Sequence, residues 1–252
     1  MQIDGKKAVV VGGASGMARA SAELLRDRGA AVAIVDLPTS PGAEVAEALG
    51  GTFHPVDVTD HEGVERVLAE AVEQLGGLHI AVNTAGGGIA KRTLTKDGPH
   101  PLADFQRVID LNLIATFNLN RLQAHHMSGN EPDDGERGVI IDTASIAAFE
   151  GQIGQVAYTA AKAGIAGMTL TMARDLGSLG IRVLTIAPSL FDTGLTHGIP
   201  DEFAEVLTKD AAFPKRMGRP EEYGRLVVAI VETPMLNGSC IRLDAGQRFA
   251  PK

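Results

Sequence analysis

The sequence predicts an α/β fold with a doubly wound parallel sheet, flanked by helices on both faces. Short apolar runs rich in valine and isoleucine alternate with longer amphipathic segments along the whole chain. This order favours right-handed β-α-β units and a sheet that is buried on both sides. A glycine cluster, Gly12 to Gly16, separates the first apolar run from the first helical segment. Together these observations predict one Rossmann domain over residues 1–252.

Each element has a local signal. The expected strands are residues 7–11, 31–36, 51–56, 79–82, 139–145, 182–187 and 239–243. The first expected helix follows the glycine cluster and ends at about residue 28, where Gly29 stops it. The next two cover residues 43–49 and the segment from a cap at Asp60 to about residue 75. Further helices are expected over 158–179, over 201–209 and from Pro220 onward. A long helix after Pro101 is expected to bury the stripe Leu102, Phe105, Ile109, Leu113 and Thr116. Residues 91–101 and 130–138 are expected to form loops.

Composition limits the classes of function. The chain has 252 residues, of which 44% are apolar, and a net charge of −8. We therefore expect a full core and no nucleic-acid partner. The single cysteine, Cys240, is expected to be a small core residue. No apolar run is long enough to span a membrane, and the first residues resemble no leader, so a cytoplasmic location is expected. His125 and His126 lack metal-ligand spacing, and no metal is expected.

A serine, a tyrosine and a lysine suggest proton-transfer chemistry. Tyr158 and Lys162 are four residues apart in an expected helix, so they share one face. A neighbouring ammonium is expected to lower the pKa of the phenol. Ser145 ends the preceding strand and is positioned to hold a reacting oxygen. This set suits alcohol oxidation or ketone reduction if a cofactor takes the hydride. Alone, the Tyr–Lys pair would more often be an exposed helix face.

The glycine cluster and a later acidic residue predict the cofactor. Gly12 and Gly16 lie where a helix N-terminus offers free N–H groups to a pyrophosphate. Asp36 ends the second strand, where a carboxylate accepts the ribose hydroxyls of adenosine and repels a 2′-phosphate. Leu37 follows it, and Ser15 is not basic. The sequence therefore predicts NAD in preference to NADP, although Asp36 before Pro38 could also be a turn residue.

The serine, the tyrosine 13 residues later and the lysine four further resemble the active-site signature of the short-chain dehydrogenase/reductase family. The resemblance covers essentially the whole chain. Val11 and Ala18 depart from the family's Thr-Gly-x-x-x-Gly-x-Gly loop, and the missing threonine hydroxyl predicts a lost bracing bond. The resemblance implies catalytic roles for Ser145, Tyr158, Lys162 and Asn112. It implies cofactor contacts from Gly12, Ser15, Gly16, Met17, Asp36, Asp57, Val58, Asn83, Ala85, Gly86, Tyr158, Lys162, Pro188 and Thr193.

Longer segments are similar to one subfamily, the type II 3-hydroxyacyl-CoA dehydrogenases, also called 17β-hydroxysteroid dehydrogenase type 10. They are residues 104–118, 130–133 with 137–141, 143–155, 185–188 and 236–245. The resemblance implies reversible NAD-dependent oxidation of an L-3-hydroxyacyl-CoA, with Ser145, Tyr158 and Gln152 facing the substrate. A plain loop role for Gln152 remains equally open. Lys91, Arg92 and Lys96 are expected to be solvated, although they could meet CoA phosphates.

Other functions remain open at this point. A 3-ketoacyl reductase, an alcohol dehydrogenase or a hydroxysteroid dehydrogenase would use the same catalytic set. A non-catalytic NAD-binding module is a more remote alternative, because the complete set of four polar residues would then be unused. Small residues on the tyrosine helix permit close helix packing, and the family resemblance implies a homotetramer.

Overall fold

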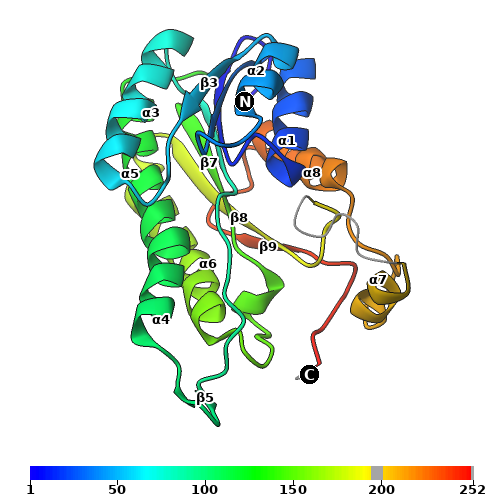
Figure 1. Cartoon of the computed structure of the whole chain (residues 1–252). Helices are drawn as coiled ribbons and strands as arrows, with labels where there is room; N and C mark the ends of the chain where they lie inside the picture. Colours follow the sequence, from blue (N-terminus) through cyan, green and yellow to red (C-terminus); the bar gives the residue numbers. More distant parts are fainter. Residues whose placement is uncertain (194–200, 251–252) are drawn as a thin grey trace.

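The computed structural model describes residues 1–193 and 201–250, and within them seven parallel strands form the central sheet. The strand order is β3-β2-β1-β4-β7-β8-β9 (Figure 1). These strands are β1 (Lys7–Val11), β2 (Ala31–Asp36), β3 (Thr52–Pro55), β4 (Ile80–Asn83), β7 (Gly138–Thr143), β8 (Ile181–Pro188) and β9 (Cys240–Leu243). The order reverses between β1 and β4, which makes this the topological switch point. The predicted doubly wound Rossmann fold is confirmed.

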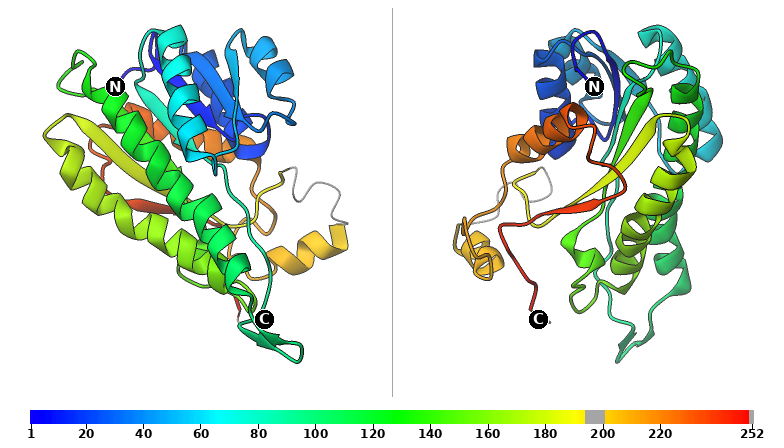
Figure 2. Two further views of the ribbon diagram at one scale, coloured as in Figure 1. Left: turned by 60° about the vertical axis from the view of Figure 1, so that its left-hand side comes forward. Right: turned by 180° about the vertical axis from the view of Figure 1, so that it is seen from behind.

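Helices cover both faces of the sheet (Figures 1 and 2). They are α1 (Gly16–Asp27), α2 (Gly42–Leu49), α3 (His61–Leu75), α4 (Leu102–Ile109), α5 (Ala115–Ser128), α6 (Val156–Gly177), α7 (Asp201–Thr208) and α8 (Pro220–Glu232). The expected caps are present at two of them. The Asp60 carboxylate accepts a hydrogen bond from the Gly63 N–H at 3.0 Å and so starts α3. Pro220 opens α8, and its Glu222 carboxylate accepts from the Arg219 N–H at 2.8 Å.

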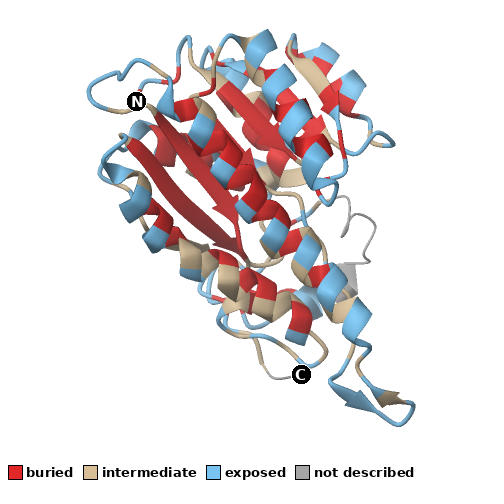
Figure 3. Ribbon diagram, turned by 90° about the vertical axis from the view of Figure 1, so that its left-hand side faces the viewer, coloured by how far each residue is buried: buried red, intermediate tan, exposed pale blue. Residues whose placement is uncertain are grey.

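Alternate residues along each inner strand enter two separate cores. On β1, Ala8 and Val10 pack on the side of α1, α2 and α8, whereas Val9 and Val11 pack on the side of α3, α5 and α6. Every residue of β7 and β8 is buried (Figure 3). The sheet is therefore a rigid platform, and residues just beyond its strand ends are held in fixed positions.

The segment before and within the long helix differs from expectation. Residues 91–101 contain a hairpin of β5 (Leu94–Thr95) and β6 (Gly98–Pro99), which projects from the body near α4 (Figure 2). The helix is interrupted by a π-helical turn, Asp110–Ile114. The expected buried stripe is wrong at its start, in α4, before this turn is reached. Leu102 is 69% exposed, while Val108 is buried.

Candidate active site

The loop after β1 holds its shape through glycine and through bonds from two neighbouring strands. Gly12 has φ +79°, and a Cβ there would lie 2.7 Å from the Thr84 Oγ1 atom, so a side chain does not fit. The Gly12 N–H donates to the Val35 carbonyl at 2.8 Å. The Thr84 hydroxyl donates to the Val11 carbonyl at 3.0 Å. Thr84 therefore braces the loop at Val11 from the end of β4.

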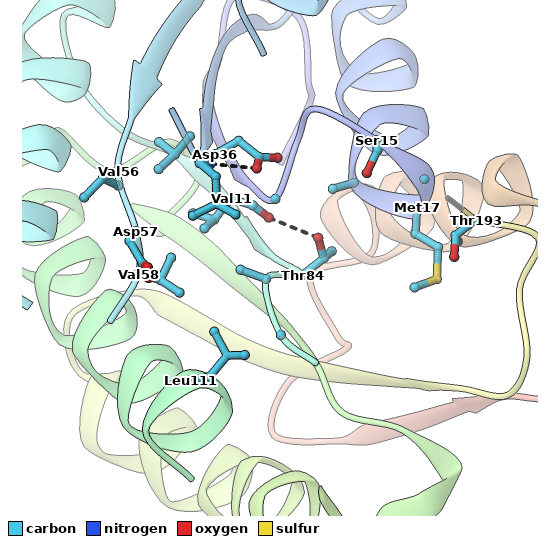
Figure 4. A pocket seen from close by; sticks show the side chains of 17 residues that line it. Val11, Ser15, Met17, Asp36, Val56, Asp57, Val58, Thr84, Leu111 and Thr193 are labelled. Atoms are coloured by element: carbon cyan, nitrogen blue, oxygen red, sulfur yellow. Dashed lines mark hydrogen bonds between the residues drawn. The ribbon is translucent and has the colours of Figure 1, made fainter. Parts of the chain in front are cut away.

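Asp36 connects the end of β2 to this loop. One of its carboxylate oxygens accepts from the Ala14 N–H at 2.9 Å, and the other accepts from its neighbour Leu37 at 2.7 Å. The carboxylate is therefore fixed in direction at the edge of the cleft (Figure 4). Because each oxygen has two lone pairs, it retains capacity for hydroxyl donors from a ligand.

A cavity of about 320 Å³ lies above the strand ends at the switch point, and Figure 4 shows its side chains. Ten of the residues expected from the sequence to bind the cofactor line it. They are Gly12, Ser15, Gly16, Met17, Asp36, Asp57, Val58, Ala85, Gly86 and Thr193. Among the described residues that line the cavity, the charged ones are acidic, Asp36 and Asp57. The apolar residues Val56, Val58 and Leu111 also line it, and apolar lining suits the faces of a planar base.

A second cavity, of about 380 Å³, continues from the first. The two share Met17, Thr84, Gly86 and Thr193 in their linings, so they form one elongated cleft. The second part is lined by the expected residues Ser145, Tyr158, Lys162 and Pro188. The structure therefore brings the proton-transfer set and the expected cofactor residues to one cleft.

Three elements place the reactive side chains. Ser145 follows β7 in extended backbone (φ −167°), where its Oγ accepts from the Ala147 N–H at 3.1 Å. Tyr158 lies in the first turn of α6. Lys162, one turn later, is only 3% exposed and places its Nζ 5.6 Å from the centre of the Tyr158 ring. Its ammonium donates to the Thr143 carbonyl at 2.8 Å.

The electrostatics differ in one respect from the sequence-based expectation. Burial raises the pKa of Tyr158 above its usual value, and the hydrogen bond with Ser145 opposes this rise only in part. The expected net lowering of the Tyr158 pKa is therefore wrong for this structure, because desolvation outweighs it. Burial also lowers the pKa of Lys162 to about 8, and the negative charge of Asp142 acts in the opposite direction.

Asn112 lies in the π-helical turn and joins this turn to the loop after β4. Its amide group donates to the Val108 carbonyl at 2.8 Å and to the Gly87 carbonyl at 2.7 Å. Its oxygen accepts from the Gly87 N–H at 3.2 Å. A Cβ on Gly86 would lie 2.5 Å from this oxygen and 3.3 Å from the Lys162 Nζ atom. The Asn112 amide and the Lys162 ammonium thus border the same small space.

Several expected residues are placed differently. The side chain of Asn83 is buried beneath the cleft, where its amide bonds to Asn120 and Gln123, so a direct cofactor contact from it is not supported. Gln152 lines a neighbouring surface hollow with Arg92, whereas Gln155 lines the Tyr158 cavity.

The basic loop and the cysteine also have defined surroundings. Lys91 pairs with Asp104 at 2.7 Å, while Lys96 is exposed at the hairpin. Cys240 is only partly buried, but burial still raises the pKa of its thiol to about 11. The thiol therefore stays protonated at neutral pH, and a catalytic role for it gains no support.

The residues fit a dinucleotide. The glycine turn at the start of α1 lies against Thr84 and Thr193 so closely that a Cβ on Gly12 or Gly16 would meet them. Such a turn lets a pyrophosphate approach backbone N–H groups at a helix N-terminus. The fixed carboxylate of Asp36 and the apolar walls continue the site at one end, and Tyr158 and Lys162 lie in the cavity at the other.

Comparison with known proteins decides the family. The family model for short chain dehydrogenases matches residues 6–203. The chain belongs to the short-chain dehydrogenase family. It is 51% identical to human 3-hydroxyacyl-CoA dehydrogenase type-2 over 254 residues, covering 99% of this chain and 97% of that protein. It is 50% identical to the Drosophila melanogaster protein of the same name, covering 96% and 97% of the two chains.

A solved structure gives the same result. The crystal structure of 3-hydroxyacyl-CoA dehydrogenase type-2 from Mycobacterium avium superposes with a TM-score of 0.94 at 42% identity, covering 98% of each chain. This member of the family is an oxidoreductase, and membership implies that it binds a nicotinamide cofactor. Among the described residues, no helix is both long and apolar enough to cross a membrane.

Proposed function

We propose that the chain catalyses the reversible oxidation of an L-3-hydroxyacyl-CoA to the 3-ketoacyl-CoA with NAD. The observation that carries this proposal is the identity of about half of all residues, over nearly the full length, to enzymes named 3-hydroxyacyl-CoA dehydrogenase type-2. The continuous cleft, with an acidic residue at one end and a phenol with an ammonium at the other, supports it.

The proposed roles follow from the chemistry of each side chain. A nicotinamide bound in this cleft would supply the hydride transfer to or from C3 of the substrate. Ser145 donates a hydrogen bond to the substrate oxygen, and Tyr158 removes the proton from that oxygen in the oxidative direction. Because burial raises the pKa of Tyr158, its phenolate needs a stabilising charge. Lys162 provides this charge from the same helix face. Asn112 lies beside the Lys162 ammonium, near Gly86.

The preference for NAD rests on Asp36. Its carboxylate is held at the cleft edge by two backbone N–H groups, and the described lining offers no cation to a 2′-phosphate. Ribose hydroxyls would complete the carboxylate's hydrogen bonds, whereas a phosphate would be repelled.

A substrate panel tests the reaction. Acetoacetyl-CoA and longer 3-ketoacyl-CoA thioesters should be reduced with NADH faster than hydroxysteroid ketones, measured by the loss of NADH absorbance. Preference for a ketosteroid or a simple ketone would replace this proposal with another member of the family. NADH binding without turnover of any ketone would favour the non-catalytic module.

We also propose that residues 1–252 fold as one domain and that the protein is a homotetramer. Helices α5 and α6 expose the large apolar side chains of Phe117 and Leu170, at 51% and 47%. Exposed apolar groups on neighbouring helices support packing against another copy. Light scattering should give four times the chain mass of 26.3 kDa, and a stable monomer would contradict the assembly.

A further inference from the structure

A buried polar cluster lies between the sheet and α5. It consists of Asn83 at the end of β4, Asn120 and Gln123 on α5, and Asp142 on β7. All four residues are buried, and Asp142 is only 1% exposed. A carboxylate removed from water is costly unless its oxygens are satisfied. The cluster is therefore a feature that needs an explanation beyond packing.

The hydrogen bonds of this cluster favour the ionised form of Asp142, against the effect of burial. Asn83 donates to one carboxylate oxygen at 3.0 Å, and Asn120 donates to the other at 2.6 Å. Gln123 closes the network by donating to the Asn83 amide oxygen at 2.8 Å. Both carboxylate oxygens therefore act as acceptors. These bonds stabilise the ionised form and oppose the rise in the Asp142 pKa that burial causes.

The charge of this carboxylate acts on Lys162. The lysine ammonium is bound to the carbonyl of Thr143, which directly follows Asp142 on β7. Burial disfavours the charged forms of both Asp142 and Lys162, and each charge favours the other. The attraction is through space, since the hydrogen bonds of Asp142 go to amides and that of Lys162 goes to a carbonyl.

The other groups around Asp142 do not provide a competing charge. Its titratable neighbours among the described residues are Lys162 on α6 and the Tyr223 hydroxyl on α8. Tyr223 is bonded to the Thr143 hydroxyl at 2.7 Å, and burial keeps it neutral. From β4 and α5 the cluster receives uncharged amides. Among the described residues, Lys162 is thus the cation that the Asp142 carboxylate stabilises.

We propose that Asp142 is a positioning residue for the reaction: its buried carboxylate, held by Asn83 and Asn120, keeps the Lys162 ammonium charged next to Tyr158. Asp142 does not reach the cleft and acts only through Lys162. The inference rests on the proposed role of Lys162 in nicotinamide-dependent chemistry. It does not depend on which ketone is the substrate.

The first test compares Asp142→Asn with Gln123→Met by fluorescence titration of NADH binding across pH 6 to 10. The Asp142→Asn variant removes the charge and keeps the shape. The Gln123→Met variant disturbs the amide network but leaves the charge. NADH binding should weaken as Lys162 loses its proton at high pH. Without the Asp142 charge, the midpoint of this weakening should lie about one pH unit lower than in the wild type. That shift makes binding at pH 8 about five-fold weaker, because the charged fraction of a lysine falls from about one half to about one tenth.

The Gln123→Met profile should overlay that of the wild type. An Asp142→Asn profile that overlays the wild type, or an equal shift in both variants, would overturn the inference. Since NADH binding is measured without an acyl-CoA, failure of 3-ketoacyl-CoA turnover would count against the proposed function and not against this inference.

A second test covers the case in which Asp142→Asn does not fold. Infrared difference spectra of the wild type should show a carboxylic-acid band that disappears with a midpoint near pH 6, the pKa to which burial raises Asp142. The Asn120→Leu variant removes the donor to one oxygen of Asp142, so this midpoint should rise. A midpoint that the variant leaves unchanged would show that Asp142 is not the titrating group and would overturn the inference.

Discussion

Replacing Asp36 with alanine should change which dinucleotide the enzyme uses. A hydrogen bond to a charged group contributes about 1.5–3 kcal/mol, and losing one to a ribose hydroxyl should lower kcat/KM for NADH by about 10- to 100-fold. A carboxylate about 4 Å from a phosphate charge costs about 1 kcal/mol in water and about 4 kcal/mol near a protein surface. Relief of this repulsion helps NADPH only. The NADPH-to-NADH ratio of kcat/KM should therefore rise by at least about 50-fold.

The assay is steady-state reduction of acetoacetyl-CoA with each cofactor, and Asp60→Ala is the matched control. Asp60 also accepts a backbone N–H, that of Gly63 at 3.0 Å, but it lies outside the cleft lining. Both variants lose a carboxylate and a backbone hydrogen bond, so both should be less stable. Only Asp36→Ala should alter the cofactor ratio. Equal use of NADPH and NADH by the wild type, or an unchanged ratio in Asp36→Ala, would refute the reasoning.

Three further results are expected. Tyr158→Phe should lower kcat by about 10²- to 10⁴-fold with unchanged NADH affinity by fluorescence titration; near wild-type turnover would remove Tyr158 from the mechanism. Gly12→Ala, with φ +79° and a Cβ 2.7 Å from Thr84 Oγ1, should lower the free energy of unfolding by about 1–3 kcal/mol in urea titrations and weaken NADH binding. Gly50→Ala (φ +63°, open space) controls for the backbone cost alone, and an equal loss there would contradict the role of the Thr84 contact. Finally, burial raises the pKa of Asp142 to about 6, so the folded state binds its proton more tightly than the unfolded state. The stability this provides is complete below about pH 4 and is lost as pH rises through 6. Urea unfolding should show the wild type losing stability relative to Asp142→Asn over that range, and parallel pH curves would disprove the shift.

The sequence was sufficient for the fold because local patterns determine it. Alternating apolar runs and helical segments fix the β-α-β order, and glycine and asparagine or aspartate signals fix element ends to within one or two residues. The hairpin at 94–99 was missed because its strands are only two residues long and mostly exposed. The π-helical turn was missed because apolar periodicity assumes one continuous helical phase. Within this turn Asn112 bonds to Gly87, which lies 25 residues earlier in the chain.

The candidate site was predictable only where a motif marks it. Gly12, Asp36, Tyr158 and Lys162 lie at positions that simple rules identify, and the structure places all of them on one cleft. Thr84 was missed, since nothing local shows that its hydroxyl braces Val11. Asp142 was missed for a different reason. It lies on a strand that is buried along its whole length, and its hydrogen-bond partners are 22 and 59 residues away in the sequence.

The shifts at Asp142 and Lys162 define a pH window for the site. Burial brings the pKa of Asp142 up to about 6 and that of Lys162 down to about 8, so both are charged mainly between these values. Two buried charges are a poor source of stability, because well-packed apolar residues in their place are often neutral or stabilising. The pair matters for the reaction because the Lys162 ammonium lies 5.6 Å from the centre of the Tyr158 ring. Lys162 can favour a phenolate only while it is charged, and Asp142 holds it charged in a place from which water is excluded. Burying these two charges thus lowers the stability of the fold, but the pair keeps Lys162 charged next to Tyr158 at neutral pH.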